Sequence, residues 1–592
     1  MNIINLLPVL ISLYLFISIP LFAQLDSLQE PDSSGINPAQ EQLLEQNTQA
    51  DESPLLEFLQ SENKNQAGIR IRSRVRSQLE DASGYTDGYY LGSPIQSYQR
   101  IMLNDGTHFS AGVLAQKDPG EIRVNDFITG NIMLSNIGFL SKLIVGDYFL
   151  ESGQGVAFWR SIDVTKGPNV VFPVNRNERG LLPYSYSGES GFLRGIAGEF
   201  RVAGSTVSLM YSDAPENSYL DGEGRVTGFY TSGYFNTVSS LEKKDDVSEQ
   251  LVGARVRLPV SNNAVVGLTG YRASFSRTLF LEDGVIVDGT NFSMGTINYQ
   301  VKMSNTSFFG EWGRSNGEFG GTSGLLIDPE RSVTIVAEVR NYPHRFLSLH
   351  GLAFGEGSFN ESGAYFGIVL RPHDHFKISA YDDLFSFPKS ASKLFGSTGN
   401  DFLIQTEFLP VRKFGISIRY QRKAAEERED ITTPAGLTGS ITDQKFTQLL
   451  RFNIEYQLSA NAHLRGRIDE TFLNYASSSA QERGMLEYQD IGVHCAPPLW
   501  MNFRLIYFST DSYYSRVYEL ERDLPGVSSM PALYGEGVKW YVLLKYSFHT
   551  TFDLNVKYSE LLRDDVKYIG TGQDELPSNR DPRIGVQVDM HW

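Results

Sequence analysis

The sequence contains a single cysteine, Cys495, among its 592 residues. One thiol cannot form an intrachain disulfide framework, and it cannot supply a cysteine metal cluster. Beyond residue 24 the sequence also lacks any apolar run near the roughly 20 residues that a membrane-spanning helix requires. Positive charge is in deficit, with 52 Lys and Arg against 69 Asp and Glu, for a formal net charge of −17. This balance argues against a generally basic nucleic-acid-binding protein.

Apolar and aromatic residues are nevertheless plentiful, at 41% and 12% of the chain. This content is too high for a generally disordered protein, whereas the mean hydropathy of −0.24 is too low for a bundle of membrane helices. A bilayer can also be crossed by a closed β-barrel, whose strands need only about 9–11 residues with alternating faces. The composition is therefore compatible with a membrane barrel.

The N-terminal region has the pattern of a secreted protein. Residues 1–23 are uncharged and mostly apolar, and Ala23 provides the small residue that precedes a signal-peptidase cut. We expect a signal peptide over 1–23. An uncleaved membrane anchor is the alternative, because the segment MNIIN lacks Lys and Arg. Residues 24–67 are rich in Gln, Glu and Ser, which is typical of a partly helical or disordered periplasmic spacer.

From residue 68 onward, apolar and polar residues alternate. The segment IRIRSRVRSQL places Ile69, Ile71 and Val75 on one face and arginines on the other. The same period of two returns in segments 413–421, 448–458, 538–548 and 551–559. Such alternation is typical of strands with one apolar face, in a soluble sandwich as well as in a barrel.

The connections between these strands separate the two folds, because short and long ones alternate along the chain. We expect eleven tight turns, at residues 103–108, 138–143, 202–206, 259–264, 303–307, 341–345, 371–375, 410–413, 459–463, 496–500 and 548–551. The clearest long polar connections are 318–332, 424–444, 509–537 and 562–583. Short periplasmic turns and long external loops are typical of outer-membrane barrels.

The fold predicted from this pattern is all-β. Residues 68–592 are expected to form one large, closed, antiparallel transmembrane β-barrel of about 24 strands, within a range of 18–26. An even number of strands places both termini on the periplasmic side of the outer membrane.

The segment RIGVQVDMHW, residues 583–592, alternates as cleanly as any strand in the chain. We expect it to pair with the first strand, because closure removes both open edges of the sheet. An aromatic residue is favoured at the membrane interface. The apolar residues of the segment are therefore expected to act as the signal for barrel assembly: Val586, Val588, Met590 and Trp592.

Residues 68–215 resemble a known family. The similar runs are RSRVRSQLEDASGY, YYLGSPIQSYQRIMLN, SAGVLAQKDPGE, DFITGNIMLSNIGFLSKLIVGDYFLESGQGVAFW and RNERGLLPYSYSGESGFLRGIA. They resemble the Bacteroidota outer-membrane proteins usually labelled helix-hairpin-helix domain-containing. The most specific piece is GDYFLESGQG, and the residues matched to the family motif are Gly146, Asp147, Tyr148, Gly153, Gln154, Gly155 and Trp159.

The resemblance implies a barrel in the outer membrane of a Gram-negative, Bacteroidota-like bacterium. In that family a competence-type DNA-binding module precedes the barrel. Here LLEFLQSENKNQ leads almost directly into AGIRIRSRV, so the module is missing. A DNA-uptake-related barrel is therefore an alternative function that rests on the resemblance alone.

Catalytic motifs are missing from the sequence. It contains no GxSxG, HExxH, EF-hand loop or P-loop. Eight of the nine histidines are expected at or beside tight turns or the chain end, and only His350 in mid-strand. The fragment HDH at 373–375 is the best candidate for a periplasmic metal or pH-sensitive site, but turn histidines are the simpler interpretation. We therefore expect no enzyme, catalytic residue, metal or cofactor.

The face opposite the apolar one is strongly basic. If the apolar face meets lipid, the cations of the inner wall are Arg70, Arg72, Arg74, Arg76, Arg255, Arg257, Arg419, Arg451, Arg465, Arg467, Arg504, Lys539, Lys545 and Lys557. The same face carries few acids, among them Glu455, Asp469, Asp553 and Asp589. This basic wall either forms a path for an anionic solute or pairs with acids of an inserted loop. The candidate plug loop is 151–190.

The leading hypothesis is an outer-membrane channel or transporter for an anionic or polymeric solute. The alternative is a non-conducting structural or surface-assembly barrel that acts with a partner machine. The partners expected are outer-membrane lipid, the barrel assembly machinery, the solute and a periplasmic protein that contacts 24–67. Nucleic acid as a partner stays open.

Overall fold

The computed structural model describes residues 67–592 except 160–165, 282–286, 331, 358–359, 389–395, 412, 433–437 and 479; for 427–432 and 438–442 it describes the backbone only. The chain divides into two units, Met1–Thr48 and Gln49–Trp592, and all described residues lie in the second. The predicted signal peptide and all but the end of the predicted spacer lie outside the described residues. Within those residues, no helix has both the length and the apolar character needed to span a bilayer.

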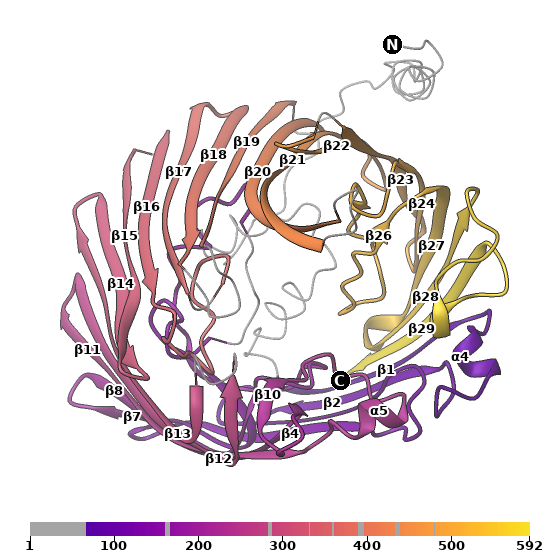
Figure 1. Ribbon diagram of the computed structural model, residues 1–592. Coiled ribbons are helices and arrows are strands. Elements are labelled where there is room, and N and C mark those ends of the chain that lie inside the picture. Colours follow the sequence, from indigo (N-terminus) through magenta and orange to yellow (C-terminus); the bar gives the residue numbers. More distant parts are fainter. Residues whose placement is uncertain are drawn as a thin grey trace. The chain divides into compact units, whose positions relative to one another are not determined.

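The second unit is a closed ring of antiparallel strands (Figure 1). Its sheet contains 27 strands, and apart from the short β6, β9 and β10 they form a barrel of 24. The prediction of a large antiparallel β-barrel of the outer-membrane type, with about 24 strands, is confirmed.

The first half of the ring, to β16, consists of these strands in chain order: β1 (Gly68–Gln78), β2 (Gln96–Asn104), β3 (Phe109–Lys117), β4 (Phe127–Ile137), β5 (Leu140–Glu151), β7 (Leu193–Val202), β8 (Ser205–Glu216), β11 (Val247–Ser261), β12 (Ala264–Leu281), β13 (Val287–Met303), β14 (Thr306–Ser315), β15 (Glu318–Glu330) and β16 (Val333–Tyr342).

The remaining strands of the ring are β17 (Glu361–His373), β18 (Phe376–Phe387), β19 (Ser397–Val411), β20 (Phe414–Thr432), β21 (Thr438–Ser459), β22 (Ala462–Tyr475), β23 (Gln481–Ala496), β24 (Leu499–Thr510), β27 (Glu536–Phe548), β28 (Phe552–Arg563) and β29 (Arg580–His591). The connections contain only short elements: α4 (Ser83–Thr86), β6 (Gly180–Pro183), β9 (Ser218–Leu220), β10 (Val226–Phe229), α5 (Val238–Leu241), β25 (Val517–Tyr518), β26 (Ala532–Leu533), η2 (His549–Thr551) and η3 (Gly572–Asp574).

The ring closes between β1 and β29. These strands pair antiparallel from Arg70 opposite His591 to Gln78 opposite Arg583. Ile69 and Trp592 continue the ladder, because each backbone N–H donates to the other's carbonyl oxygen at 3.0 Å. The alternating C-terminal segment is therefore the closing strand of the barrel, as expected.

Ten of the eleven predicted tight turns lie where the sequence places them, and one is wrong. Segment 318–332 was expected to be a long loop, but most of it is β15, and the tight turn follows at Glu330–Val333. Residues 341–345 were expected to be a tight turn, but a long connection begins there. The glycines of β15 resemble a loop signal, yet they serve packing: a Cβ on Gly324 would lie 2.4 Å from the ring of Phe309.

The predicted long loop 424–444 is also wrong in extent. Strands β20 and β21 continue through both sides of it, paired as far as Thr432 opposite Thr438. Figure 1 shows this hairpin curling toward the inside of the ring. The segment is polar although its backbone is paired, so polarity alone did not distinguish strand from loop.

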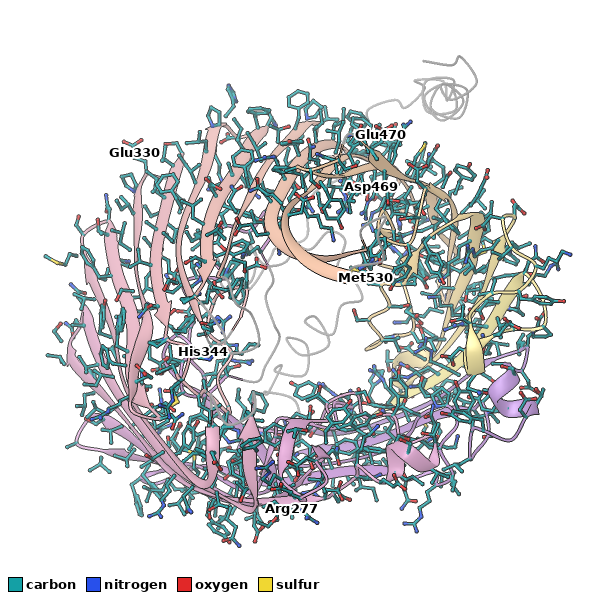
Figure 2. The ribbon with its side chains drawn as sticks, viewed as in Figure 1. Arg277, Glu330, His344, Asp469, Glu470 and Met530 are labelled. Atoms are coloured by element: carbon teal, nitrogen blue, oxygen red, sulfur yellow. The ribbon has the colours of Figure 1, made fainter. Side chains whose placement is uncertain are left out.

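The two faces of the wall differ as the alternation predicts. At the closing seam, Val75 and Val586 point outward and are 43% and 38% exposed, whereas Arg74 and Gln587 point inward and are buried. Figure 2 shows the same change of side for the consecutive residues Asp469 and Glu470. Exposed apolar side chains continue around the ring, among them Ile101, Val113, Ile132, Val145, Ile196, Leu209, Val252, Leu268, Ile297 and Val339. This outer surface suits lipid.

Among the described residues, three connections fold into the ring (Figure 1). We call them, in their described parts, the first inward loop (152–159 and 166–192), the second inward loop (343–357 and 360) and the third inward loop (511–535). Each packs apolar side chains against the wall. Val156 and Leu347 join one buried cluster, Val170 and Phe354 a second, and Val517 and Leu533 a third. The hydrophobic core of this barrel therefore lies between the wall and its own loops.

Candidate functional site

The first inward loop begins with the matched motif, which wraps around a wall carboxylate. Glu311 of β14 is fully buried and accepts hydrogen bonds from the backbone N–H groups of Gln154 at 2.8 Å and Val156 at 2.9 Å. Gly153 and Gly155 have φ values of +55° and +87°, which turn the amide groups toward this carboxylate. The motif GQG is thus a backbone cradle for a carboxyl side chain of the barrel wall itself.

The other motif residues fix the same region. Asp147 accepts a hydrogen bond from the guanidinium of Arg194 at 2.6 Å, and the Tyr148 hydroxyl donates to the carbonyl of Tyr211 at 2.9 Å. Gly146 has no room for a side chain, because a Cβ would lie 2.2 Å from the carbonyl oxygen of Gly130. The backbone N–H of Trp159 donates to the carbonyl of His350, 2.9 Å away in the second inward loop. Gly146, Asp147 and Tyr148 therefore join strands of the wall, and Trp159 joins the first two inward loops.

His350 was expected in mid-strand, and that prediction is wrong. It lies in the second inward loop, buried, with its Nε2 at 3.0 Å from a carboxylate oxygen of Glu249 on β11. Its ring stacks on Phe158, with centroids 5.6 Å apart. These contacts of the ring with Glu249 and Phe158 belong to the tertiary structure, so the local sequence did not predict them.

The third inward loop brings three acids to the basic wall at alternate positions. Glu519, Glu521 and Asp523 are all nearly or completely buried. Glu519 pairs with the guanidinium of Arg504, which also lies 2.9 Å from Asp490. Arg504 of β24 therefore contacts both Asp490 of the neighbouring wall strand β23 and Glu519 of the third inward loop.

Lysines of the next strands complete this arrangement. Lys557 on β28 lies 2.8 Å from both Glu521 and Asp523, and Lys539 on β27 pairs with Glu521. Asp523 also faces Arg76 of β1 at 3.8 Å. The loop acids therefore face cations from β24, β27, β28 and β1, which follow one another around the ring with only β29 between the last two.

The remaining predicted wall cations have various partners. Arg255 and Arg257 lie 2.6 and 3.1 Å from Glu178 of the first inward loop, and Arg74 donates to the carbonyl of Pro525 at 3.4 Å. Acids or amides of the wall contact Arg72 (Asp589), Arg419 (Gln405), Arg451 and Arg467 (Asp469), Arg465 (Glu455) and Lys545 (Asp553). Arg70 is exposed near the end of β1.

Sequence reasoning therefore named the cations but missed their principal partners. The predicted plug 151–190 does fold inward in its described part, yet it supplies only Glu178 to the predicted basic wall. The segment 509–537 was expected outside the barrel, and it carries Glu519, Glu521 and Asp523. Their spacing of two residues, which matches the spacing along a strand face, was the available signal.

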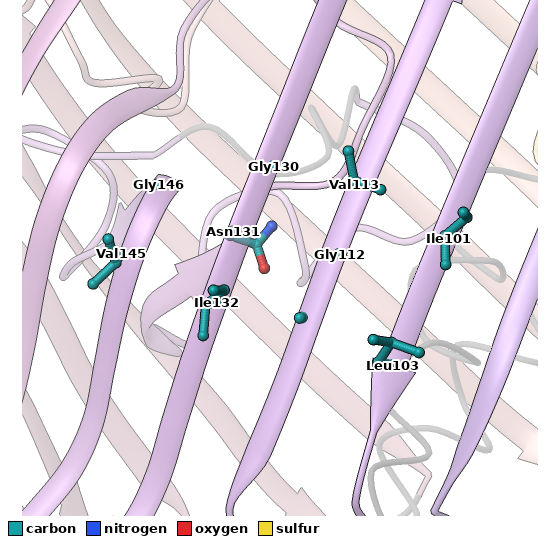
Figure 3. Close-up of a pocket in the computed structure, with 10 residues that line it drawn as sticks. Ile101, Leu103, Gly112, Val113, Gly130, Asn131, Ile132, Val145 and Gly146 are labelled. Carbon is teal, nitrogen blue, oxygen red and sulfur yellow. The ribbon is translucent and has the colours of Figure 1, made fainter.

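A shallow apolar hollow lies on the outside of the barrel, where Figure 3 shows side chains of β2 to β5 around it. Ile101, Val113, Ile132 and Val145 line it from the lipid-facing side, and Gly130 leaves space between them. Its position on the outer face separates it from the charged interior.

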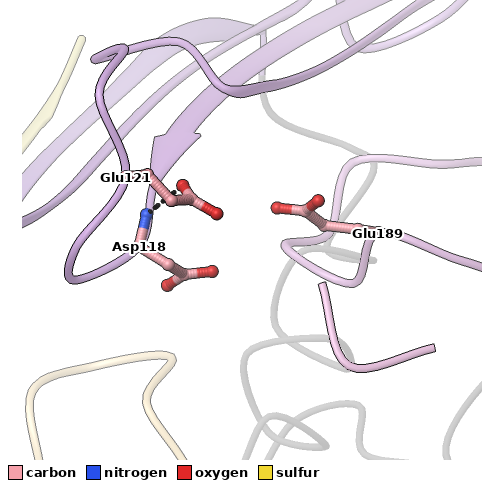
Figure 4. A group of neighbouring side chains, drawn as sticks. All are labelled: Asp118, Glu121 and Glu189. Atoms are coloured by element: carbon pink, nitrogen blue, oxygen red, sulfur yellow. Dashed lines mark hydrogen bonds between the residues drawn. The ribbon is translucent and has the colours of Figure 1, made fainter. Parts of the chain in front are cut away.

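A group of three carboxyls lies in the connections outside the spanning strands (Figure 4). One oxygen from each of Asp118, Glu121 and Glu189 lies within 4.8 Å of the others. Burial, and then the charges of Glu121 and Asp118, raise the pKa of Glu189 to about 9. Burial also raises the pKa of Glu121 and of Asp118. Carboxylate oxygens can hold a cation, but a proton on Glu189 relieves the same repulsion.

The HDH fragment lies at the tight turn between β17 and β18. The rings of His373 and His375 are stacked, with centroids 6.2 Å apart. In the described part of the chain, the only group of at least three possible ligands is the carboxyl group of Figure 4. The two histidines therefore lack a third ligand among those residues.

Comparison with known proteins gives no family. No protein-family model and no curated protein matches the chain. Among solved structures, the copper transporter OprC is 8% identical, with a TM-score of 0.45, over 89% of this chain and 81% of its own. The siderophore receptor PirA from Acinetobacter baumannii is 7% identical with a TM-score of 0.42, and the ferric enterobactin receptor PfeA from Pseudomonas aeruginosa 8% with 0.43, over the same shares.

Proposed function

We propose that the protein is an outer-membrane transporter for an anionic solute that passes along the basic wall inside the barrel. The observation that supports this proposal is the part of the chain from which the acidic partners of the wall cations come. The cations on β24, β27, β28 and β1 are fixed in the wall, but most of the acids that neutralise them belong to the third inward loop. We expect this pattern, fixed cations in the wall and acids on a loop, in a wall that binds anions.

Because these ion pairs are buried, each cation of the wall depends strongly on its acidic partner. A buried cation that loses its partner is strongly destabilising, because its solvation is not restored. Arg504 and Lys557 are both at most 5% exposed, so they need an anion at all times. An anionic solute can meet that need as it passes, whereas a neutral one cannot.

The alternative of a non-conducting barrel is supported by the same pairs if the third inward loop never leaves the wall. In that case the barrel serves a structural or surface-assembly role, as the sequence also allowed. The resemblance to the helix-hairpin-helix family, the periplasmic position of both termini and a partner for 24–67 remain predictions beside either function.

Conductance of the purified protein in planar bilayers separates these functions. We expect discrete openings that favour chloride over potassium, and a reduced preference in the Lys539→Gln, Lys557→Gln double variant. Lys567→Gln, at an exposed lysine between β28 and β29, is the matched control and should keep the preference. Folded protein without any openings, in the wild type and in the loop variants described below, would favour the non-conducting barrel.

A further inference from the structure

We propose that residues 519–523 of the third inward loop are a built-in substitute for the transported ligand, and that this ligand is an extended peptide with acidic residues at alternate positions. The proposal rests on the proposed function and names its substrate class. The loop segment would occupy the ligand's binding track, and the ligand would enter by exchanging with it.

The geometry of the track supports this proposal. Its cations do not follow one strand but cross the barrel wall from β24 through β27 and β28 to β1. Adjacent strands are about 4.8 Å apart, so the row spans roughly 19 Å. Acids at alternate positions of a peptide recur about every 6.6 Å when it is extended. Glu519, Glu521 and Asp523 therefore cover about 13 Å of this row. The long side chains of Arg504 and Arg76 reach in from its two ends to Glu519 and Asp523.

The charges give the exchange its selectivity. With the loop in place, its three acids oppose Arg504, Lys539, Lys557 and Arg76. Without the loop, Asp490, next to Arg504, is the only wall acid that an ion pair places against these cations among the described residues. With the loop in place, Asp490 also lies 4.0 Å from the loop's own Arg522. Four cations and one acid leave an excess of three positive charges in a buried wall. Withdrawal of the loop is therefore favourable only when another anion replaces it.

Apolar contacts keep the track occupied when no ligand is present. Val517 and Leu533, which pair within β25 and β26, pack against Tyr541 of the wall, and Leu524 and Val527 pack against Leu543. The acids lie between these two groups of contacts. A competing ligand must therefore supply acids in a row rather than a single charge.

The test uses the full-length protein with its loop acids weakened. In the Glu519→Gln, Glu521→Gln, Asp523→Asn variant, the synthetic peptide VYELERDLPG (residues 517–526) should bind and block the conductance. The peptide VYQLQRNLPG should bind at least about tenfold more weakly, because it lacks the three carboxylates. The wild type and Glu223→Gln, a variant at an exposed loop acid, should bind either peptide poorly, because their own loop occupies the track.

Some outcomes would overturn this proposal. Equal binding of the acidic peptide and of the peptide without the three carboxylates would contradict the binding track. Tighter binding of a single-stranded oligonucleotide would assign the track to nucleic acid instead. Glu521→Gln alone, which leaves two of the three acids, gives the same comparison if the triple variant does not fold. Peptide binding measured by fluorescence anisotropy does not require conductance, so a silent barrel that binds the acidic peptide would contradict the proposed transport but not the track.

Discussion

At the scale of single residues, two buried carboxyls show how surroundings decide their chemistry. Glu311 is enclosed by backbone N–H groups of the first inward loop and by the Thr296 hydroxyl at 2.8 Å. Glu189 faces two other carboxyls instead, and its Oε1 is buried without a hydrogen-bond partner among the described residues. The first carboxyl is surrounded by hydrogen-bond donors, whereas the surroundings of the second favour a proton.

Glu189 makes the stability of its loop depend on pH. Between the ordinary value of 4.5 and about 9, the folded state holds a proton that the unfolded state has released. Stability therefore falls as pH rises through this window, by at most about tenfold in the opening equilibrium per pH unit. We expect protease resistance around residues 184–192 to decline from pH 5 to pH 9 in the wild type.

The Glu189→Gln variant should lose most of this decline, because an amide stays neutral throughout. Glu223→Gln, at a side chain that is 74% exposed, should retain it. An unchanged pH profile in Glu189→Gln would assign the dependence to other groups.

At the scale of elements, the closing strand tests the assignment of the two faces. Val586 of β29 lies on the lipid-facing side opposite Val75. Aspartate there would carry charge into the lipid, at a cost of up to about 2 kcal/mol. We expect Val586→Asp to slow or block assembly, seen as loss of the compact band that unheated barrels give in electrophoresis, whereas Val586→Ile assembles normally. Normal assembly of the aspartate variant would contradict the assigned face.

Strands were predictable from the sequence where alternation and turn residues agreed. The closing strand β29 and ten tight turns followed from local pattern alone, because the side-chain period of two is fixed by the backbone. The pair β15–β16 was misplaced because the glycines of β15 serve contacts with β14 that only the folded sheet reveals. The position of the third inward loop also depends on cations hundreds of residues away, such as Arg76. Local sequence does not contain that information.

At the scale of the whole molecule, closure can be tested with a covalent bond across the seam. Ile69 and Trp592 exchange both backbone hydrogen bonds, so the next pair, Arg70 and His591, is a non-hydrogen-bonded pair. The Cα atoms of such a pair are about 4.5 Å apart, which a disulfide accepts. We expect Arg70→Cys, His591→Cys in a Cys495→Ser background to oxidise readily in the folded protein.

The disulfide closes residues 70 to 591 into one covalent loop. In denaturing electrophoresis without reductant, this looped chain should migrate differently from the linear chain. Arg70→Cys alone provides the control, because it has no partner thiol. Two thiols that stay fully reactive toward maleimide in folded protein would argue that β1 and β29 are not neighbours.

The seam also has a consequence for how the chain is made. Arg72 and Asp589 meet across 517 residues of sequence, whereas neighbours such as Ser261 and Ala264 are joined by one turn. Neighbouring strands can pair as hairpins early in assembly, but the ring cannot close until β29 reaches β1. A partly assembled barrel therefore carries two unpaired sheet edges until its closing strand is in place. Its yield in the cell should depend on whatever holds those edges apart from other chains.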